Sequence, residues 1–170
     1  MNERNPYEAP QTPIVGTDSD SELAGLGERL GAALIDVVLM MLIVLPVMFV
    51  GGYFDMVMEA AMRGQQVSLL EQVKWGVIGT VIFYLVQGYP LSASGQTWGK
   101  RILKIKIVDL QGRKPSFARL AGLRYLPMQL ANLIPFVGGL IALVNVLMIF
   151  RSDRRCGHDL IAGTRVVNAR

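Results

Sequence analysis

Apolar residues occur in long runs along this chain, and the longest run covers residues 30–50. Its only charged member is Asp36. A helix of about 20 residues measures roughly 30 Å, which is the thickness of the hydrocarbon layer of a bilayer. The core helices of soluble proteins seldom need such a run, so the pattern predicts a transmembrane helix.

Three further apolar runs predict more membrane helices, at residues 75–91, 117–134 and 136–150. The loop after the second predicted helix and the C-terminal tail are both rich in Lys and Arg, which gather on the cytoplasmic side of membrane proteins. Both can lie inside only if residues 117–150 cross an even number of times, or dip in and return. We therefore expect an all-α membrane protein with a four-helix transmembrane bundle and both termini in the cytoplasm. The arginines within 117–134 leave open whether that segment spans the membrane or lies along it.

Two short stretches have a different pattern. Residues 103–107 alternate strictly between apolar and basic, as in a half-exposed β-strand, and Thr164 to Val167 is the other strand-like run outside the membrane. Because a lone strand is not stable, we predict that strands near 103–109 and 164–168 pair in a small, hairpin-like cytoplasmic sheet. The glycine-rich residues 95–100 lack the spacing of a phosphate-binding loop and are expected to form the turn into this sheet.

The remaining segments are polar or mixed. Residues 1–22 contain three prolines and almost no core-forming side chains, so they are expected to be a disordered cytoplasmic tail, with 23–170 as one membrane domain. Between the first two membrane helices, apolar residues recur at helical spacing over 56–61, which indicates a short amphipathic helix at the membrane surface.

The composition excludes several classes of function. Hydrophobic residues make up 52% of the chain, which is high for a soluble domain of this size. The net charge of +4 comes from basic residues beside apolar segments, which fits orientation in a membrane better than nucleic-acid binding. Cys156 and His158 are the single cysteine and the single histidine, too few for a multi-ligand metal site or a convincing nucleophile–base pair. We expect no enzymatic activity, no cofactor and no nucleic-acid partner.

Ionisable residues in the apolar segments are the strongest functional candidates, because a charge inside a span is costly and usually faces protein or water. Arg29 and Asp36 are seven positions apart and therefore lie about 20° from each other on a helix. In the second predicted helix, Tyr84 and Gln87 share a face; they either pair with the first helix or are polar groups tolerated near the head groups.

Three stretches, at residues 28–36, 96–109 and 155–164, resemble the signature of the RDD family, which is named for an arginine and two aspartates. The resemblance covers roughly residues 25–168 and implies that Arg29, Asp36 and Asp159 are the naming residues. It further implies a multi-pass protein of the bacterial inner membrane that is suspected of transport, with cation/proton antiport attributed to some members.

Two hypotheses follow for the candidate residues Arg29, Asp36, Asp159 and Arg124. In the first, proton and monovalent cation compete for Asp36, Arg29 sets its affinity, and Asp159 sits at the cytoplasmic mouth of a transporter. In the second, the four residues form a structural charge network in a non-catalytic scaffold or accessory subunit. Besides the lipid bilayer, the expected partners are a second copy of the chain or another membrane protein.

Overall fold

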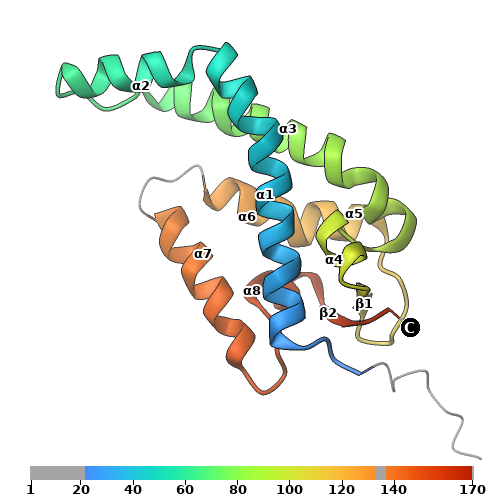
Figure 1. Ribbon diagram of the computed structural model, residues 1–170. Coiled ribbons are helices and arrows are strands. Elements are labelled where there is room, and N and C mark those ends of the chain that lie inside the picture. The colour runs from blue at the N-terminus through green and yellow to red at the C-terminus, as the bar shows by residue number, and fades with distance from the viewer. Residues whose placement is uncertain (1–21, 133–136, 170) are drawn as a thin grey trace, which may run out of the picture.

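The computed structural model describes residues 22–132 and 137–169. The predicted N-terminal tail therefore lies almost wholly outside the described residues, as do residues 133–136, where the third predicted membrane helix ends and the fourth begins. Figure 1 shows a mainly helical protein in which the polar elements gather at one end of a long central helix.

Among the described residues, two helices have the length and composition to cross a membrane: α1 (Leu26–Val50) and α3 (Leu69–Ser94). None of the most apolar stretch of either helix is buried within the protein. Large apolar side chains such as Leu42 and Phe49 point outward instead, and water is a poor solvent for such a surface. Both helices extend beyond the predicted ranges 30–50 and 75–91. Between them, α2 (Tyr53–Met62) confirms the expected short helix.

The other two predicted membrane helices are present as shorter helical segments. One is continuous through α5 (Phe117–Arg119), the π-helical η2 (Leu120–Tyr125) and α6 (Leu126–Ala131). The other consists of α7 (Val137–Leu147) and the 3₁₀ turn η3 (Met148–Phe150). Each is shorter than the ~20 residues that a full span needs. The structure therefore supports two spans and a helical pair, and it does not establish a four-helix transmembrane bundle.

A proline accounts for the irregular helix in the first of these segments. Pro127 has no backbone N–H, so it cannot bond to the carbonyl one turn earlier, and the preceding turn widens into η2. Such π turns are often found at functional sites. This one carries Arg124.

The predicted sheet is confirmed as an antiparallel pair of β1 (Ile105–Asp109) and β2 (Thr164–Asn168). Its register runs from Ile105 opposite Asn168 to Asp109 opposite Thr164. The strands are far apart in sequence, so the sheet is a long-range pairing rather than a true hairpin. Leu23 adds one bridge to Val167, which ties the start of the described chain to its end.

Two short helices complete the polar end of the molecule: α4 (Trp98–Ile102) and α8 (Gly157–Ala162). We refer to α4, β1, α8 and β2 together as the cap. A turn was predicted where α4 forms; the chain does turn at Gly95, in the left-handed region with a φ of 67°, but Thr97 then caps a new helix.

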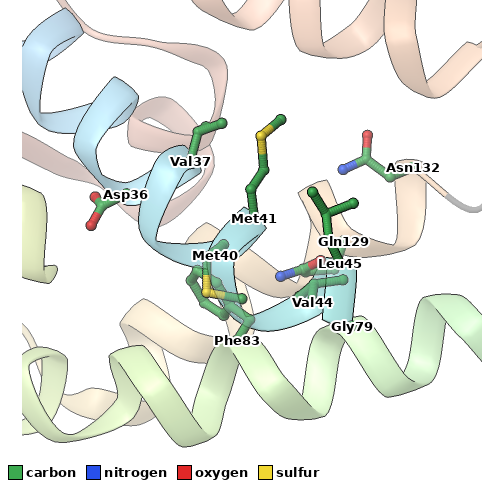
Figure 2. A pocket seen from close by; sticks show the side chains of 10 residues that line it. All are labelled: Asp36, Val37, Met40, Met41, Val44, Leu45, Gly79, Phe83, Gln129 and Asn132. Atoms are coloured by element: carbon green, nitrogen blue, oxygen red, sulfur yellow. The ribbon is translucent and has the colours of Figure 1, made fainter. Parts of the chain in front are cut away.

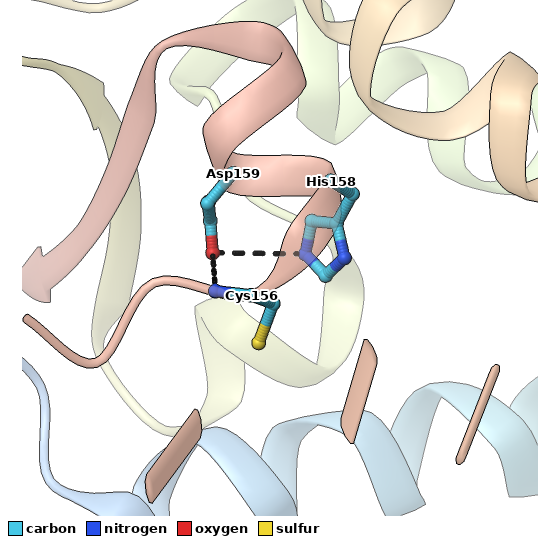
Figure 3. A group of neighbouring side chains, drawn as sticks. All are labelled: Cys156, His158 and Asp159. Atoms are coloured by element: carbon cyan, nitrogen blue, oxygen red, sulfur yellow. Dashed lines mark hydrogen bonds and ion pairs between the residues drawn. The ribbon is translucent and has the colours of Figure 1, made fainter. Parts of the chain in front are cut away.

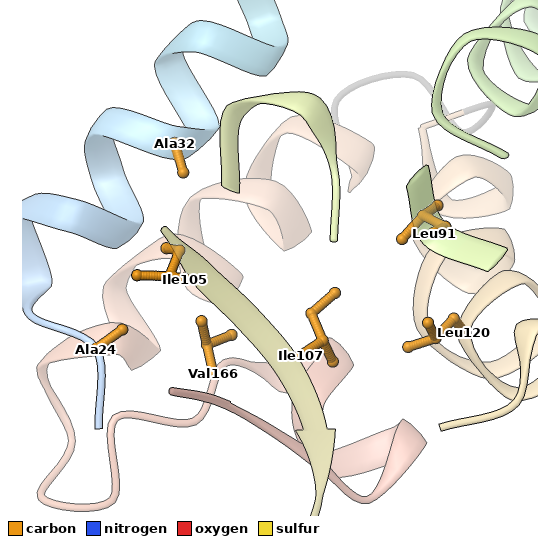
Figure 4. Packing of buried hydrophobic residues seen from close by; sticks show 7 residues of the cluster. All are labelled: Ala24, Ala32, Leu91, Ile105, Ile107, Leu120 and Val166. Atoms are coloured by element: carbon orange, nitrogen blue, oxygen red, sulfur yellow. The ribbon is translucent and has the colours of Figure 1, made fainter. Parts of the chain in front are cut away.

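A small apolar core joins the cap to the helices (Figure 4). Its members come from α1, α3, β1, η2 and β2, with Ala24 just before α1. They are Ala24, Ala32, Leu91, Ile105, Ile107, Leu120 and Val166. Away from this junction, the long helices pack against rather little of the chain, which is the arrangement expected where lipid supplies the remaining contacts.

The cap approaches α1 so closely that one position has no room for a side chain. A Cβ atom on Gly99 would lie 2.1 Å from the carbonyl oxygen of Ala32 and 3.0 Å from Cγ of Asp36. Because the nearest atom is backbone, no rotamer change can relieve the clash.

We predict that Gly99→Ala lowers the free energy of unfolding by at least about 1–3 kcal/mol, the usual cost of overpacking. Alanine ordinarily stabilises a helix by about 1 kcal/mol relative to glycine. A loss of stability on Gly99→Ala would therefore indicate the steric clash. Thermal unfolding of the purified protein in detergent measures the effect. The matched control is Gly88→Ala in α3, where an added Cβ meets nothing within 4 Å. Equal stability of the two variants would contradict the close approach of α4 to α1.

Candidate functional site

Asp36 lies on the face of α1 that meets the cap, and both of its carboxylate oxygens accept hydrogen bonds. Oδ1 accepts from the backbone N–H of Gly99 at 2.8 Å and from Nε2 of Gln87 at 3.0 Å. Oδ2 accepts from the hydroxyl of Thr97. The first N–H groups of a helix have no partner inside that helix, and here Asp36 supplies one from a neighbouring helix.

Gln87 and Trp98 complete the attachment of α4. The side-chain oxygen of Gln87 accepts from the backbone N–H of Trp98 at 3.0 Å, and the Trp98 indole N–H donates to the carbonyl of Val86 at 2.8 Å. Gln87 is fully buried. Of the two polar residues that the sequence analysis singled out in α3, Gln87 pairs with the first helix, whereas the Tyr84 hydroxyl donates to the carbonyl of Ala121.

Arg124 and Asp159 form a buried ion pair between η2 and α8. The hydroxyl of Thr164 accepts from Arg124 and donates to Asp159, and the backbone N–H of Cys156 donates to the other oxygen of Asp159 at 3.3 Å. Burial alone would raise the pKa of Asp159. The charge of Arg124 and these hydrogen bonds outweigh burial and hold the pKa below its usual value.

His158 belongs to the same network as a neutral side chain. Its Nε2 lies 3.0 Å from Arg124 Nη2, which can only donate, so its Nδ1–H donates to the side-chain oxygen of Asn145 at 2.9 Å. Burial and the charge of Arg124 lower the pKa of His158 to about 3. The 3.7 Å separation of His158 Nε2 from Asp159 is therefore not an ion pair at cellular pH.

Cys156, His158 and Asp159 bring three potential metal ligands within 4.8 Å of one another (Figure 3). The guanidinium of Arg124, however, already occupies both the Asp159 carboxylate and Nε2 of His158. A metal ion would have to displace it and then meet its charge. We therefore assign the three residues to the hydrogen-bond network.

The guanidinium of Arg29 donates hydrogen bonds to the backbone of the C-terminal segment. Its Nη atoms donate to the carbonyls of Arg154 and Val166. No ion pair or hydrogen bond joins Arg29 to Asp36 within the described part of the chain. One face of α1 thus makes two separate attachments. Arg29, near the start of α1, binds β2, and Asp36, two turns later, binds α4.

A cavity of about 460 Å³ lies between α1, α3 and α6, with Asp36 at one end (Figure 2). Its wall is mostly apolar, with Met40, Val44 and Phe83 among the lining residues, and Gln129 and Asn132 contribute amide groups. In Figure 2 the Asp36 carboxylate lies apart from the apolar side chains.

Comparison with known proteins identifies the chain. Residues 23–163 match the model of the RDD family. The chain belongs to the RDD family. The uncharacterized protein YckC of Bacillus subtilis is 33% identical over 86% of this chain and 85% of its own length. An uncharacterized protein of Haemophilus influenzae is 32% identical over 54% of this chain, a match that spans 57% of that protein. No solved structure matches the chain.

The resemblance described above places the RDD naming residues at Arg29, Asp36 and Asp159, and in this RDD protein all three bind other parts of the same chain. Arg29 holds β2, Asp36 holds α4, and Asp159 holds Arg124. The network also includes residues that sequence reasoning did not select: Thr97, Asn145 and Thr164. Thr97 stands directly before a short helix, a position at which threonine is a known N-cap, so that signal was present. For Asn145 and Thr164 the chain offers no local signal, because their partners are distant in sequence.

We predict that Arg124 and Asp159 are strongly coupled, whereas Arg29 and Asp36 are not. Arg124→Met or Asp159→Leu alone leaves a buried charge without its partner and should cost about 3–5 kcal/mol, while the double variant should cost much less than the sum. Arg29→Met and Asp36→Leu share no partner, so their effects should add within about 0.5 kcal/mol. Unfolding of all six variants in detergent measures both cycles. Strong coupling in the second cycle would mean that Arg29 and Asp36 interact after all.

Proposed function

We propose that this RDD protein is a non-catalytic membrane scaffold or accessory subunit, in which Arg29, Asp36 and Asp159 fasten a cytoplasmic cap to the membrane helices. One observation carries the proposal: every oxygen of the Asp36 and Asp159 carboxylates accepts a hydrogen bond from the protein itself. A carboxylate that exchanged protons for cations would have to release these donors in each cycle.

The energetic cost of such a release favours the structural role. A hydrogen bond to a charged group contributes roughly 1.5–3 kcal/mol, and Asp36 accepts three of them. Removing them would also free the first turn of α4, and with it the start of β1. The Asp36 carboxylate is therefore better suited to holding one conformation than to alternating between two.

Cation/proton exchange is the second candidate, and the cavity beside Asp36 is the observation that favours it. This cavity of about 460 Å³ could hold several waters or hydrated ions next to a carboxylate, with the amides of Gln129 and Asn132 nearby. Its largely apolar wall counts against an ion path, because an ion in such surroundings loses most of its hydration.

For the membrane arrangement, we propose that α1 and α3 cross fully, with the cap in the cytoplasm and the N-terminus on the same side. The helical pair between residues 117 and 150 would enter from the cytoplasmic side and return to it, with arms shorter than a full span. The gathering of α4, β1, α8 and β2 at the first turns of α1 supports this arrangement (Figure 1). The basic residues of the cap support a cytoplasmic position.

The tip of the helical pair gives a direct test of topology. Gly138 is buried against the backbone of Ala131, but a Cβ on the exposed neighbour Gly139 meets nothing within 4 Å. In a Cys156→Ser background, we expect Gly139→Cys to resist a membrane-impermeant maleimide added to intact cells or spheroplasts. Gln111→Cys, exposed in the cap, should react only after permeabilisation. Reaction of Gly139→Cys from outside would replace the shorter pair with four full crossings, and reaction of Gln111→Cys from outside would overturn the orientation.

The function itself is tested by proton flux in proteoliposomes of wild type and Asp36→Asn, with Na⁺, Li⁺ or K⁺ pulses. The scaffold role predicts no cation-driven proton movement by well-folded wild type. It also predicts a lower unfolding temperature for Asp36→Asn, because the neutral amide binds Gly99, Gln87 and Thr97 more weakly than a carboxylate does. Asp55→Asn, at the start of the surface helix α2, is the matched control. Flux in wild type that disappears in an Asp36→Asn protein of unchanged stability would establish the exchanger instead.

A further inference from the structure

A second, smaller cavity lies at the cap end of the molecule, where α1, α7 and α8 meet. Its volume is about 170 Å³. Its polar wall comprises Arg29, Lys100, Arg124, Asn145, His158 and Asp159. Its apolar wall includes Leu30 and Ala33 of α1, Val146 of α7, Ile149 of η3 and Val166 of β2.

Positive charge is in excess around this cavity. Arg29, Lys100 and Arg124 are three cations, and His158 is neutral. Asp159 is the one acidic side chain among the described residues that line it, and this carboxylate is already paired with Arg124. Two positive charges therefore remain without a carboxylate partner in a partly desolvated space. Such charges are costly unless an anion is bound beside them.

The cationic groups also retain unused donors. The ammonium group of Lys100 has one weak contact within the described chain, 3.5 Å to the hydroxyl of Thr97. Arg29 and Arg124 are only 6% and 2% exposed, yet the Nε of each has no hydrogen-bond partner among the described residues. Both Nε atoms are too enclosed to contact a bound group, so Arg29 and Arg124 contribute their charge to the cavity, whereas Lys100 also offers N–H donors.

The apolar wall connects the cavity to the lipid-facing surface. Leu30 and Val146 line the cavity and are nevertheless 51% and 50% exposed, so the cavity reaches the outside between α1 and α7. Its charged floor lies at the cap end of α1, which is the level of the head groups in the proposed arrangement. A group that enters here would have an anionic head among cations and an apolar remainder along α1 and α7.

From these observations, we propose that the cavity binds a phosphate group, either of an anionic phospholipid or of free inorganic phosphate. Guanidinium and ammonium groups are the usual protein partners of phosphate oxygens. A volume of about 170 Å³ is below the roughly 300–1,000 Å³ of sites for whole drug-sized ligands, so it suits one small head group. The apolar opening favours the lipid as the source. The choice of a lipid rests on the membrane arrangement proposed above. Arg29 and Arg124 also attach the cap, whereas Lys100 belongs to the cavity without taking part in those attachments.

The test measures the unfolding temperature of the purified protein, washed extensively in a neutral detergent, during separate titrations. The probes are dioctanoyl phosphatidylglycerol, dioctanoyl phosphatidylcholine as the zwitterionic control, and sodium phosphate against sodium chloride of equal ionic strength. A ligand that binds the folded state raises this temperature in a concentration-dependent way. In parallel, phospholipid that remains bound to the protein is extracted and identified by mass spectrometry.

The main variant is Lys100→Gln, which removes a cavity charge that carries little of the folded network. Lys106→Gln on β1 removes the same charge outside the cavity and is the matched control. We expect stabilisation of wild type and Lys106→Gln by phosphatidylglycerol, and a loss of affinity of about tenfold or more in Lys100→Gln. Retained anionic lipid should fall in the same variant.

Each result decides the proposal. Stabilisation by phosphatidylglycerol but not by inorganic phosphate assigns the site to a lipid head group, and stabilisation by inorganic phosphate assigns it to the free ion. The proposal is overturned if neither probe stabilises wild type and no anionic lipid is retained. It is also overturned if Lys100→Gln and Lys106→Gln behave alike.

Discussion

Polar groups beside a hydrocarbon layer must find partners within the protein, and the structure depends on how α4 meets this constraint. The start of α4 lies against α1. The first N–H groups of α4 have no partner within their own helix, and at this point they have little access to water. Asp36 and Gln87 accept from the N–H groups of Gly99 and Trp98, and the absence of a side chain at Gly99 lets the two backbones approach. The position of β1, which follows directly, depends on this contact.

In the C-terminal half of the cap the roles of side chain and backbone are reversed. Here arginine side chains donate hydrogen bonds to backbone carbonyls. Arg29 binds the carbonyls of Arg154 and Val166, and Arg119 binds that of Ala162 at 2.7 Å. Arg155 binds that of Thr164 at 3.1 Å. A guanidinium carries five donors in a rigid, planar arrangement and can join two backbone segments at once, which a lysine cannot do in the same geometry. These basic residues therefore hold the C-terminal half of the cap in place.

Much of the fold follows from local pattern, whereas the site depends on long-range contacts. The apolar runs predicted α1 and α3, and strict alternation at residues 103–107 predicted β1. Its pairing with β2 could be inferred because few other strand-like segments exist. Charge and helical spacing selected Arg29 and Asp36, but helix geometry alone could not tell that each binds a different part of the cap. The π turn at Arg124 and the helix at 98–102 were missed, since a proline inside an amphipathic pattern and a single capped turn give weak signals.

The distribution of charge at the two cavities argues for what this protein binds. Asp36 and Asp159, the carboxylates that line the two cavities, accept hydrogen bonds from the chain at every oxygen, so neither is free to attract a cation without local rearrangement. The cations Arg29, Lys100 and Arg124 exceed the acids around the cap cavity, and part of their hydrogen-bonding capacity is unused. A membrane domain with satisfied acids and surplus bases next to lipid is suited to anions. It follows that a search for the physiological partner should begin with anionic lipid and phosphate, before monovalent cations.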